Sequence, residues 1–590
     1  MAERNEPGPT RRTVVQSGIA GAAATLIANA PALAQGSPPA SSGQIDDRVQ
    51  TIKVRDGTTI AVRIYRPKAD GRYPALFAAS PYRFDNNKLP ASPQFLWRET
   101  GPIEFYVSNG YAYVHMDVRG SGRSGGEFEF LGRNDQQDLY DVIEWVGRQP
   151  WCDGKVGGIG QSYYCMQQWF MAVMAPPSLK CIAAHDGLAD PYRAVSYHGG
   201  IPCDFFGGYW WYQNQFINRF PAEGPAREQT ADFSQMIAAH PTYDAFWRER
   251  CAWEVLDGIK IPLYSSGVWS KMQLHTRGNI DAFARAQGPR KLRMSGAPNA
   301  WAAAAEFASP AFHERVLLPF YDHYLKGLDT DYVKRPQVEW AVRGAPPTLM
   351  RSAATWPPPG VSYRAWRLSP ANSGSVTSLN DGGLVSGEAS GADKTTYSYP
   401  DPSWVNGTVG FGPAGPAGGF DPARRVLTFT SAPLDAELEI AGPIKLTLFA
   451  SSTAKDTDFI VKLSEQLPQS PEDRGKGLNP AFEIVTRGWL RASHRQLDPE
   501  RSTEMVPYHA HSSGEPLTPG EVYRFDISLE PMAYLFKRGN RIRLEICNGD
   551  SAVTEALWPH YYRPDKLGSD TIHHGGAYVS ELTLPVVARA

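Results

Sequence analysis

The stretch Val156-Gly-Gly-Ile-Gly-Gln-Ser-Tyr-Tyr-Cys-Met-Gln-Gln-Trp169 decides the fold of this chain. It begins with a short run typical of a β-strand, turns at Gly160-Gln161-Ser162, and continues with apolar residues at helical spacing. A serine at the apex of such a strand, turn and helix has its hydroxyl exposed above the end of a sheet. The backbone N–H that follows it points to where an oxyanion forms. The stretch therefore predicts a nucleophile elbow at Ser162.

The elbow pattern is incomplete. A full G-x-S-x-G motif has glycine two residues after the serine, where this chain has Tyr164. A bare G-x-S triplet is common by chance, and a serine that caps an ordinary helix is the competing interpretation. Taken alone, the stretch leaves both interpretations of Ser162 open.

Length and composition restrict the class of protein. The 590 residues suggest three or four structural units. The 59 basic and 61 acidic residues nearly balance and form no basic block, which argues against nucleic acid as a partner. The 55 glycines and 49 prolines favour a globular chain rich in strands and loops. We expect a small-molecule substrate as the partner, and the sequence leaves the oligomeric state open.

Residues 1–34 predict a twin-arginine signal peptide. Arg11 and Arg12 precede a modest apolar run, and Ala32-Leu33-Ala34 offers the small residues of a cleavage site. An uncleaved membrane anchor is the competing interpretation, but the run is interrupted by glycine, asparagine and proline and is marginal for spanning a bilayer. No later segment has about 20 unbroken apolar residues. We therefore expect a periplasmic or secreted protein that has no membrane contact after cleavage.

The cysteines do not predict a metal site. They show no C-x-x-C spacing and no nearby histidine pair, so we expect neither a metal nor another cofactor. Most are interpreted as small buried apolar residues. A disulfide between Cys203 and Cys251 is left open. The six positions are 152, 165, 181, 203, 251 and 547.

Short apolar runs that alternate with helical stretches predict an α/β core over residues 44–335. It follows a Gly/Ser/Pro linker at 36–43 and opens with a β-hairpin, because Asp56-Gly57 joins two alternating runs. Such a rhythm is typical of a mostly parallel sheet covered on both faces, with its chemistry at the carboxyl ends of the strands. The runs lie at 48–54, 59–65, 74–79, 111–116, 156–159, 181–184, 261–264 and 291–294.

Four motifs, in order, resemble the CocE/NonD family of α/β-hydrolases, which includes cocaine esterase, α-amino-acid ester hydrolases and Xaa-Pro dipeptidyl-peptidases. The resemblance implies a serine hydrolase that acts on ester or amide bonds, with Ser162 as nucleophile. It also implies that the Tyr82 hydroxyl and the Tyr163 amide bind the oxyanion, and that Asp117 and Arg119 form a buried structural pair. The motifs are Ser80-Pro81-Tyr82, Asp117 to Gly126, Trp151 to Gly157, and Gly160 to Tyr163.

A helical insertion at residues 190–253 stands where this family carries its cap. It holds a dense block of aromatic residues, of which Tyr209, Trp210 and Trp211 are the candidate contacts for an apolar or aromatic substrate. Aromatic blocks are more often core than ligand wall, so the core interpretation stays open.

The resemblance weakens at the other two triad positions. The family acid lies in a G-W-x-D motif, which here reads Gly267-Val268-Trp269-Ser270, and the family histidine corresponds to Ala300. His275 and His313 are the nearest histidines, and each could be structural or a substitute base. The alternative function is therefore a catalytically weak or inactive ligand-binding member of the same fold.

From residue 336 to 590 the chain changes to short strands and Gly/Pro-rich turns. This texture predicts a β-sandwich, and it resembles the jelly-roll domain that ends the family's chains. Residues 400–422, with repeated proline and glycine, are expected to form a long irregular loop.

Overall fold

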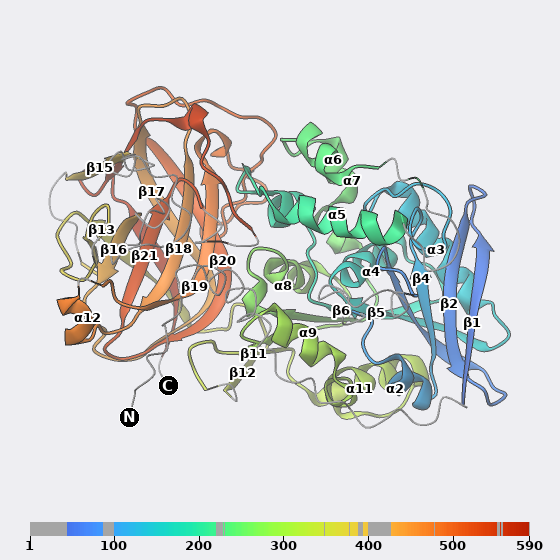
Figure 1. Ribbon diagram of the computed structural model, residues 1–590. Coiled ribbons are helices and arrows are strands. Elements are labelled where there is room, and N and C mark those ends of the chain that lie inside the picture. Colours follow the sequence, from blue (N-terminus) through green and yellow to red (C-terminus); the bar gives the residue numbers. More distant parts are fainter. Residues whose placement is uncertain are drawn as a thin grey trace, which may run out of the picture.

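The computed structural model describes residues 44–85, 99–219, 228, 231–346, 349–376, 378–387, 393–398, 426–476, 478–550, 555 and 558–588. The predicted signal peptide, the linker at 36–43 and the loop at 400–422 lie outside these residues. Two bodies stand side by side, each built around one large sheet (Figure 1). We call them the α/β body, residues 44–353, and the β body, residues 361–588.

The α/β body contains a ten-stranded sheet in the order β1-β2-β4-β3-β5-β6-β9-β10-β11-β12. β1 and β2 form the predicted hairpin, with Ile52 opposite Ile60. The neighbours from β4 to β11 pair in parallel, and their strands are almost continuously buried, as a sheet covered on both faces requires. The strands are β1 (Ile45–Lys53), β2 (Thr59–Pro67), β3 (Tyr73–Ser80), β4 (Ala112–Asp117), β5 (Cys152–Gln161), β6 (Leu179–His185), β9 (Leu263–Val268), β10 (Arg290–Ser295), β11 (Val338–Ala341) and β12 (Met350–Ala353).

Helices cover both faces of this sheet and bury a separate apolar cluster on each (Figure 1). On one face, α3 (Arg133–Gly147) buries Leu139, Val142, Ile143 and Val146, which recur at helical spacing. α4 (Tyr163–Met174) and α8 (Thr276–Arg285) lie on the same face. The other face carries α2 (Ile103–Ser108), α9 (Ala300–Ala308), α10 (Pro310–Phe312), α11 (Leu318–Tyr321) and the π-helical turns η7 (His313–Leu317) and η8 (Asp322–Lys326), followed by the 3-10 turn η9 (Asp331–Lys334).

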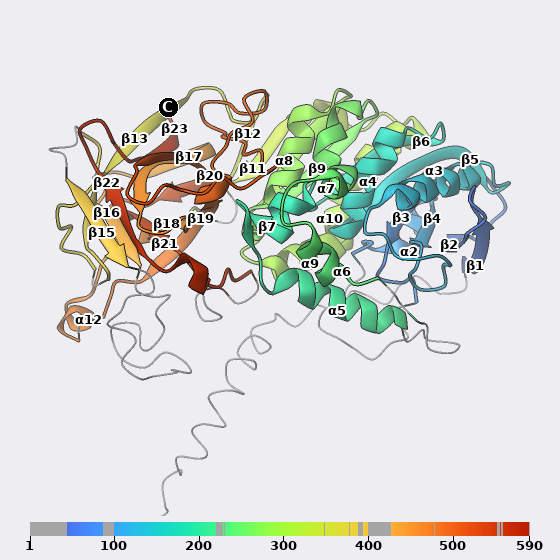
Figure 2. The ribbon, with the colours of Figure 1, turned by 90° about the horizontal axis from the view of Figure 1, so that it is seen from above.

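The predicted helical insertion runs between β6 and β9. Its longest helix, α5 (Phe206–Arg219), lies over the α4 side of the α/β body and begins beside the β body (Figures 1 and 2). Asp232 and Asp244 cap the next two helices by accepting hydrogen bonds from their first-turn amides. The other elements here are η4 (Tyr192–Ser196), β7 (Tyr197–His198), β8 (Ile201–Pro202), α6 (Phe233–Ala239), α7 (Ala245–Arg250), η5 (Ala252–Gly258) and η6 (Trp269–Lys271).

The β body is an eleven-stranded sheet that closes on itself, because β17 pairs with β20, with β22 and also with β23. Buried and half-buried residues alternate along much of β20, which is typical of a strand with one face in a core. The elements are β13 (Val361–Ser369), β14 (Gly382–Val385), β15 (Lys394–Ser398), β16 (Leu427–Ser431), β17 (Leu438–Ser452), β18 (Asp458–Gln466), α12 (Pro471–Gly475), β19 (Phe482–Arg491), η12 (Ala492–His494), β20 (Tyr523–Phe536), β21 (Arg541–Cys547), η13 (Pro564–Lys566), β22 (Ser569–His573) and β23 (Glu581–Val587).

The predicted fold class, an α/β-hydrolase core followed by an all-β domain, is confirmed. The first sheet runs beyond residue 335, because β11 pairs in parallel with β10. A four-residue strand has too little pattern to show which sheet it joins. Within the described residues, none of the helices has the length and apolarity needed to cross a membrane.

Candidate active site

Ser162 stands at the apex of a tight strand-to-helix turn between β5 and α4. Its backbone angles are φ 61° and ψ −117°, an unusual conformation for a residue that has a side chain. The Ser162 amide donates to the carbonyls of His185 and Asp186, at 3.1 and 3.0 Å. Gly160 has φ 129°, and a Cβ there would lie 2.3 Å from Tyr164 Cβ. The capping interpretation is wrong, because the Ser162 side chain makes no cap hydrogen bond to α4.

The Tyr82 hydroxyl lies beside the Ser162 hydroxyl and is hydrogen-bonded to it. It also accepts a hydrogen bond from Trp210 Nε1 at 3.0 Å. Burial, and then the charge of Glu99, raises the pKa of Tyr82 far above its usual range, so the phenol stays protonated and can donate. Tyr163 is the first residue of α4, where backbone N–H groups lack an acceptor within the helix. The two predicted oxyanion donors therefore flank Ser162.

Neither predicted substitute histidine contacts Ser162 within the described residues. His275 Nδ1 lies 3.5 Å from Asp186 Oδ1, and burial lowers the pKa of the imidazole. His313 shares a hydrogen bond of 2.7 Å with Tyr106 and contacts the carbonyl of Phe307 through its other nitrogen, and burial lowers its pKa to about 3. Because both ring nitrogens of His313 have partners, we assign this residue a structural role.

The triad positions themselves hold no acid or base. Ser270 lies in η6, and its hydroxyl is buried without a hydrogen-bond partner among the described residues. Ala300 is the first residue of α9.

Glu99 is the group that the sequence analysis missed. Its backbone carbonyl accepts the Gln161 amide at 2.7 Å, and its carboxylate accepts a hydrogen bond from Ser162. Burial raises the pKa of Glu99 to about 8, and Lys271 opposes that rise. Its Oε2 is buried without a partner among the described residues. Glu99 follows no predicted strand, so nothing in the sequence pattern indicates its place.

A buried ion pair between Lys271 and Asp186 lies next to the elbow. Lys271 Nζ is 2.5 Å from Asp186 Oδ2, and Gln161 Nε2 donates to the same oxygen at 3.0 Å. Burial alone would raise the pKa of Asp186, but the charge of Lys271 and the contacts with His275 together outweigh it and hold that pKa well below its usual range. Asp186 follows β6 and Lys271 follows β9 closely, so the rule that functional groups cluster at strand carboxyl ends could have found both.

The three aromatic candidates of the cap have different environments. Tyr209 is 39% exposed and stacks on Phe205. Trp210 stacks on Tyr163, with ring centroids 5.9 Å apart, and reaches Tyr82. Trp211 is 4% exposed and stacks on Phe128, and both tryptophans belong to the same apolar core cluster.

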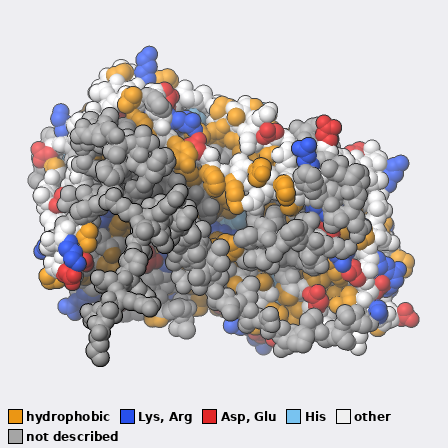
Figure 3. All heavy atoms as spheres, viewed as in Figure 1, with side chains coloured by type: hydrophobic (Ala, Val, Ile, Leu, Met, Phe, Trp, Pro, Cys, Tyr) orange, Lys and Arg blue, Asp and Glu red, His pale blue; other side chains and the backbone are white. Residues whose placement is uncertain are grey.

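Four exposed aromatic residues, just before and along α5, form an aromatic stripe. Figure 3 shows hydrophobic side chains gathered on this face of the molecule. Of the three aromatic candidates of the cap, only Trp210 touches the residues around Ser162 through contacts on the described chain. The stripe comprises Phe205, Tyr209, Tyr212 and Phe216.

Asp117 and Arg119 are buried, as predicted, but they do not pair with each other. Asp117 accepts the amides of Phe84 and Arg123, at 2.8 and 3.0 Å. Arg119 instead forms an ion pair of 2.7 Å with Asp138. The predicted pair is therefore wrong, because Asp117 ends β4 and binds two backbone amides, whereas Arg119 lies beyond the strand and reaches Asp138 of α3.

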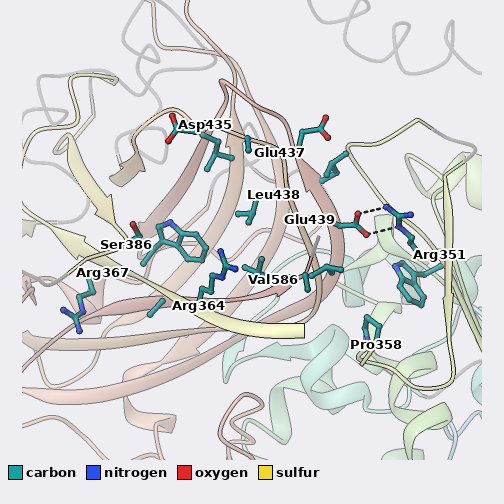
Figure 4. A pocket seen from close by; sticks show the side chains of 18 of the residues that line it. Arg351, Pro358, Arg364, Arg367, Ser386, Asp435, Glu437, Leu438, Glu439 and Val586 are labelled. Atoms are coloured by element: carbon teal, nitrogen blue, oxygen red, sulfur yellow. Dashed lines mark hydrogen bonds and ion pairs between the residues drawn. The ribbon is translucent and has the colours of Figure 1, made fainter. Parts of the chain in front are cut away.

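A groove of about 1610 Å³ lies where β11 and β12 of the α/β body meet the β body (Figure 4). It is lined by residues of β12, β13, β17 and β23, and by none of the residues around Ser162. Arg351 and Glu439, which line it, form an ion pair of 2.9 Å. The groove is thus separate from the candidate active site.

Comparisons with known proteins agree with the fold. Residues 56–298 match the family model for the X-Pro dipeptidyl-peptidase (S15 family), and residues 332–583 match the X-Pro dipeptidyl-peptidase C-terminal non-catalytic domain. A cocaine esterase of Rhodococcus sp. is 28% identical, over 91% of this chain and 98% of that protein.

Solved structures are similar along nearly the whole chain. A CocE/NonD family hydrolase from Staphylococcus aureus is 27% identical with a TM-score of 0.76, over 92% of this chain and 94% of that one. An α-amino acid ester hydrolase is 19% identical with a TM-score of 0.68, over 95% and 99% of the two chains, and shares the fold.

Proposed function

Because the chain belongs to the CocE/NonD family of serine hydrolases, we propose that it hydrolyses ester or amide bonds of small substrates with Ser162 as nucleophile and Glu99 as general base. One observation carries the assignment: the Ser162 hydroxyl, on its strained turn, is hydrogen-bonded to both Tyr82 and Glu99. A general base must lie within hydrogen-bond reach of the proton that it removes, and Glu99 meets this condition.

The first half of the reaction acylates the serine. Ser162 Oγ attacks the carbonyl carbon of the substrate while its proton passes to the Glu99 carboxylate. The oxygen of the tetrahedral intermediate becomes negative and accepts hydrogen bonds from the Tyr82 hydroxyl and the Tyr163 amide. When the intermediate collapses, the bond to the alcohol or amine breaks, and Glu99 returns its proton to that leaving group.

The second half repeats these steps with water. Glu99 takes a proton from a water molecule, which attacks the acyl carbon, and the same two donors stabilise the second oxyanion. Collapse returns the proton to Ser162 Oγ and releases the carboxylic acid. Lys271 supports this cycle through charge, since it favours the ionised form of Glu99.

We propose small apolar or aromatic groups as the substrate class. Trp210 and Tyr163 present stacked rings next to the Tyr82 hydroxyl, and pockets with apolar walls and few polar groups suit such ligands. The test is a comparison of kcat/KM for aromatic and short aliphatic acyl esters that share one leaving group. A preference for the aliphatic acyl esters would contradict the proposal.

The main test of the function is labelling by an active-site serine probe. The parent should be labelled at Ser162 and hydrolyse activated esters, and Ser162→Ala should lose both properties. A variant that is as active as the parent would end the nucleophile assignment. Labelling should be stronger at pH 9 than at pH 6, since the Glu99 base is ionised above a pKa of about 8.

A ligand-binding protein without catalysis is the second candidate. It is favoured by Ser270 and Ala300, which stand where the family has its acid and histidine. The two candidates differ in one result: a binding protein retains ligand affinity but shows no Ser162-dependent turnover at any pH between 6 and 10.

We also propose export by the twin-arginine route to the periplasm or beyond, supported by Arg11-Arg12 and the small residues Ala32-Leu33-Ala34. The mature chain would then begin near Gln35. Mass spectrometry of exported protein is the test, and finding Met1 still attached would contradict the proposal.

A further inference from the structure

Three potential metal ligands meet where the cap insertion contacts the β body. They are His198, Cys203 and His560, and their donor atoms lie within 4.8 Å of one another. His198 ends β7, Cys203 precedes α5, and His560 lies between β21 and β22. The sequence analysis predicted no metal site because the cysteines show no C-x-x-C spacing and no nearby histidine pair. Spacing along the chain does not reveal this cluster, because the fold brings His560 to His198 and Cys203 from another domain.

The surroundings of His198 determine which of its nitrogens carries hydrogen. His198 Nε2 lies 3.1 Å from the carbonyl oxygen of Ala194 and 2.8 Å from that of Gln273. A carbonyl oxygen can only accept a hydrogen bond, so Nε2 must be the donor. In a neutral imidazole, the other nitrogen then has a lone pair. His198 therefore presents a bare Nδ1.

The same reasoning applies to His560. Its Nδ1 lies 3.2 Å from Asp550 Oδ2, and Asp550 forms an ion pair of 2.6 Å with Lys462. Because an ionised carboxylate only accepts, Nδ1 of His560 carries the hydrogen and Nε2 is bare. A histidine that donates its second N–H to a carboxylate or a backbone carbonyl is the usual arrangement around a metal ligand.

The two bare nitrogens face each other. His198 Nδ1 and His560 Nε2 are 2.8 Å apart, and both residues are buried. Two lone pairs at this distance repel unless a cation or an extra proton lies between them. Either species would lie beside the Asp550 carboxylate, which already pairs with Lys462, so a metal-binding measurement has to distinguish them.

Cys203 supplies a third, softer donor. Its thiol accepts hydrogen bonds from the backbone amides of Phe205 and Phe206. Burial raises the pKa of the thiol to about 12, and these amides oppose the rise. A nearby cation would favour the thiolate in the same way. One edge of the residue remains accessible, because Cys203 is only half-buried.

We propose that His198, Cys203 and His560 bind one Zn²⁺ ion that links the cap insertion to the β body. Two imidazoles and a thiolate suit zinc, whereas Mg²⁺ and Ca²⁺ prefer oxygen ligands. Tetrahedral zinc, with Zn–N of about 2.0 Å and Zn–S of about 2.3 Å, separates its donors by roughly 3.3–3.6 Å. The present donor atoms need shifts on the order of 1 Å to reach these separations.

The site would fix the start of α5 to the β body. Contacts beside it already join the same segments: the Asp204 amide donates to the carbonyl of Pro559 at 3.0 Å, and Phe206 stacks on Trp558. α5 also carries Trp210, whose indole donates to Tyr82. The ion would therefore hold the helix that contacts the oxyanion tyrosine.

The test is zinc binding by the full chain, purified without chelators or metal-affinity resin. Elemental analysis should find about one zinc per chain, and competition with a chromophoric chelator should give its affinity. Cys203→Ser and His560→Gln should weaken zinc binding at least about 100-fold, and Asp550→Asn about 10- to 100-fold through His560. Cys251→Ala, which removes a buried free cysteine outside the cluster, should bind zinc like the parent.

Cobalt keeps the test decisive if a variant does not fold. Co²⁺ bound to the parent should show a thiolate charge-transfer band and the intense visible bands of a tetrahedral site. A parent that binds neither metal stoichiometrically would overturn the proposal and assign a shared proton to the histidine pair. Zinc binding that is unchanged in both Cys203→Ser and His560→Gln would overturn it as well.

Discussion

The variant Glu99→Gln separates a general base from a buried polar group. Glutamine has nearly the same shape as glutamate and can still accept a hydrogen bond from Ser162, but it cannot take the proton. General-base catalysis contributes about 10²- to 10⁴-fold to rates. We therefore expect kcat of Glu99→Gln to fall by that factor, or about 3–5 kcal/mol in activation free energy, while KM changes little.

The pH dependence follows from the pKa of Glu99. Burial raises this pKa to about 8, against the charge of Lys271, and only the ionised form can act as base. In the parent, kcat/KM should rise about tenfold per pH unit below pH 8 and level off above it. In Glu99→Gln, this rise should disappear and leave a low, nearly flat profile.

Stability should change in the opposite direction to activity. The pKa of Glu99 rises from its ordinary 4.5 to about 8 on folding, so between these values the folded chain retains a proton that the unfolded chain has lost. The free energy of unfolding therefore falls as pH rises through this window, by about 2–3 kcal/mol from pH 6 to pH 9. Glutamine does not titrate, so the thermal stability of Glu99→Gln relative to the parent should increase over the same range.

Asp135→Asn is the matched control. Burial, followed by the charge of Asp138, also raises the pKa of Asp135 to about 8, but its carboxylate accepts the Leu131 amide rather than the serine hydroxyl. The thermal stability of Asp135→Asn relative to the parent should also increase as pH rises. Its kcat/KM should still rise with pH as in the parent. Initial rates on an activated ester and thermal melts from pH 5 to 10 measure both effects. A Glu99→Gln variant with the parent's rate and pH profile would refute the assignment of the base.

Other variants test the remaining parts of the site. Tyr82→Phe should lower kcat by about 10²- to 10³-fold with an unchanged melting temperature, and an unchanged rate would exclude this hydroxyl from the oxyanion hole. Trp210→Phe removes the indole donor to that hydroxyl and should lower kcat without loss of soluble protein, whereas insoluble protein would make the indole a core residue. Lys271→Met removes the cation that favours the ionised base, so the midpoint of the pH profile should move upward, and a downward shift would contradict that role. The double variant Ser270→Asp with Ala300→His restores the family acid and histidine, and a large gain in rate near pH 7 would show that the natural chain works without a histidine base.

Much of the architecture could be predicted from local patterns. Asp56-Gly57 between alternating runs predicted the first hairpin, and the Val156–Trp169 stretch predicted the elbow, because turn chemistry and periodicity act over a few residues. The partners of Arg119 and the environment of Trp211 could not be predicted in this way. Both depend on side chains that the fold brings together from distant positions.

The same limit explains the two parts of the molecule that the sequence did not reveal. Glu99 reaches Ser162 through the hydrogen bond between its backbone carbonyl and Gln161, and no motif marks that contact. Cys203 meets His560 only after the β body packs against the cap insertion. Short-spacing rules for bases and metal ligands detect sites that are built within one segment, and these two sites are built between segments.

The signs of the charges at the elbow support a carboxylate base. A histidine base becomes positive when it takes the serine proton, so the usual triad places an acid beside it. A carboxylate base is negative before it takes the proton, so it requires a cation instead. This chain has Ser270 at the acid position and Lys271 directly after it, and the lysine stabilises both Asp186 and ionised Glu99. Ser270 at the acid position and the Lys271 cation beside Glu99 are thus the arrangement that the proposed carboxylate base requires.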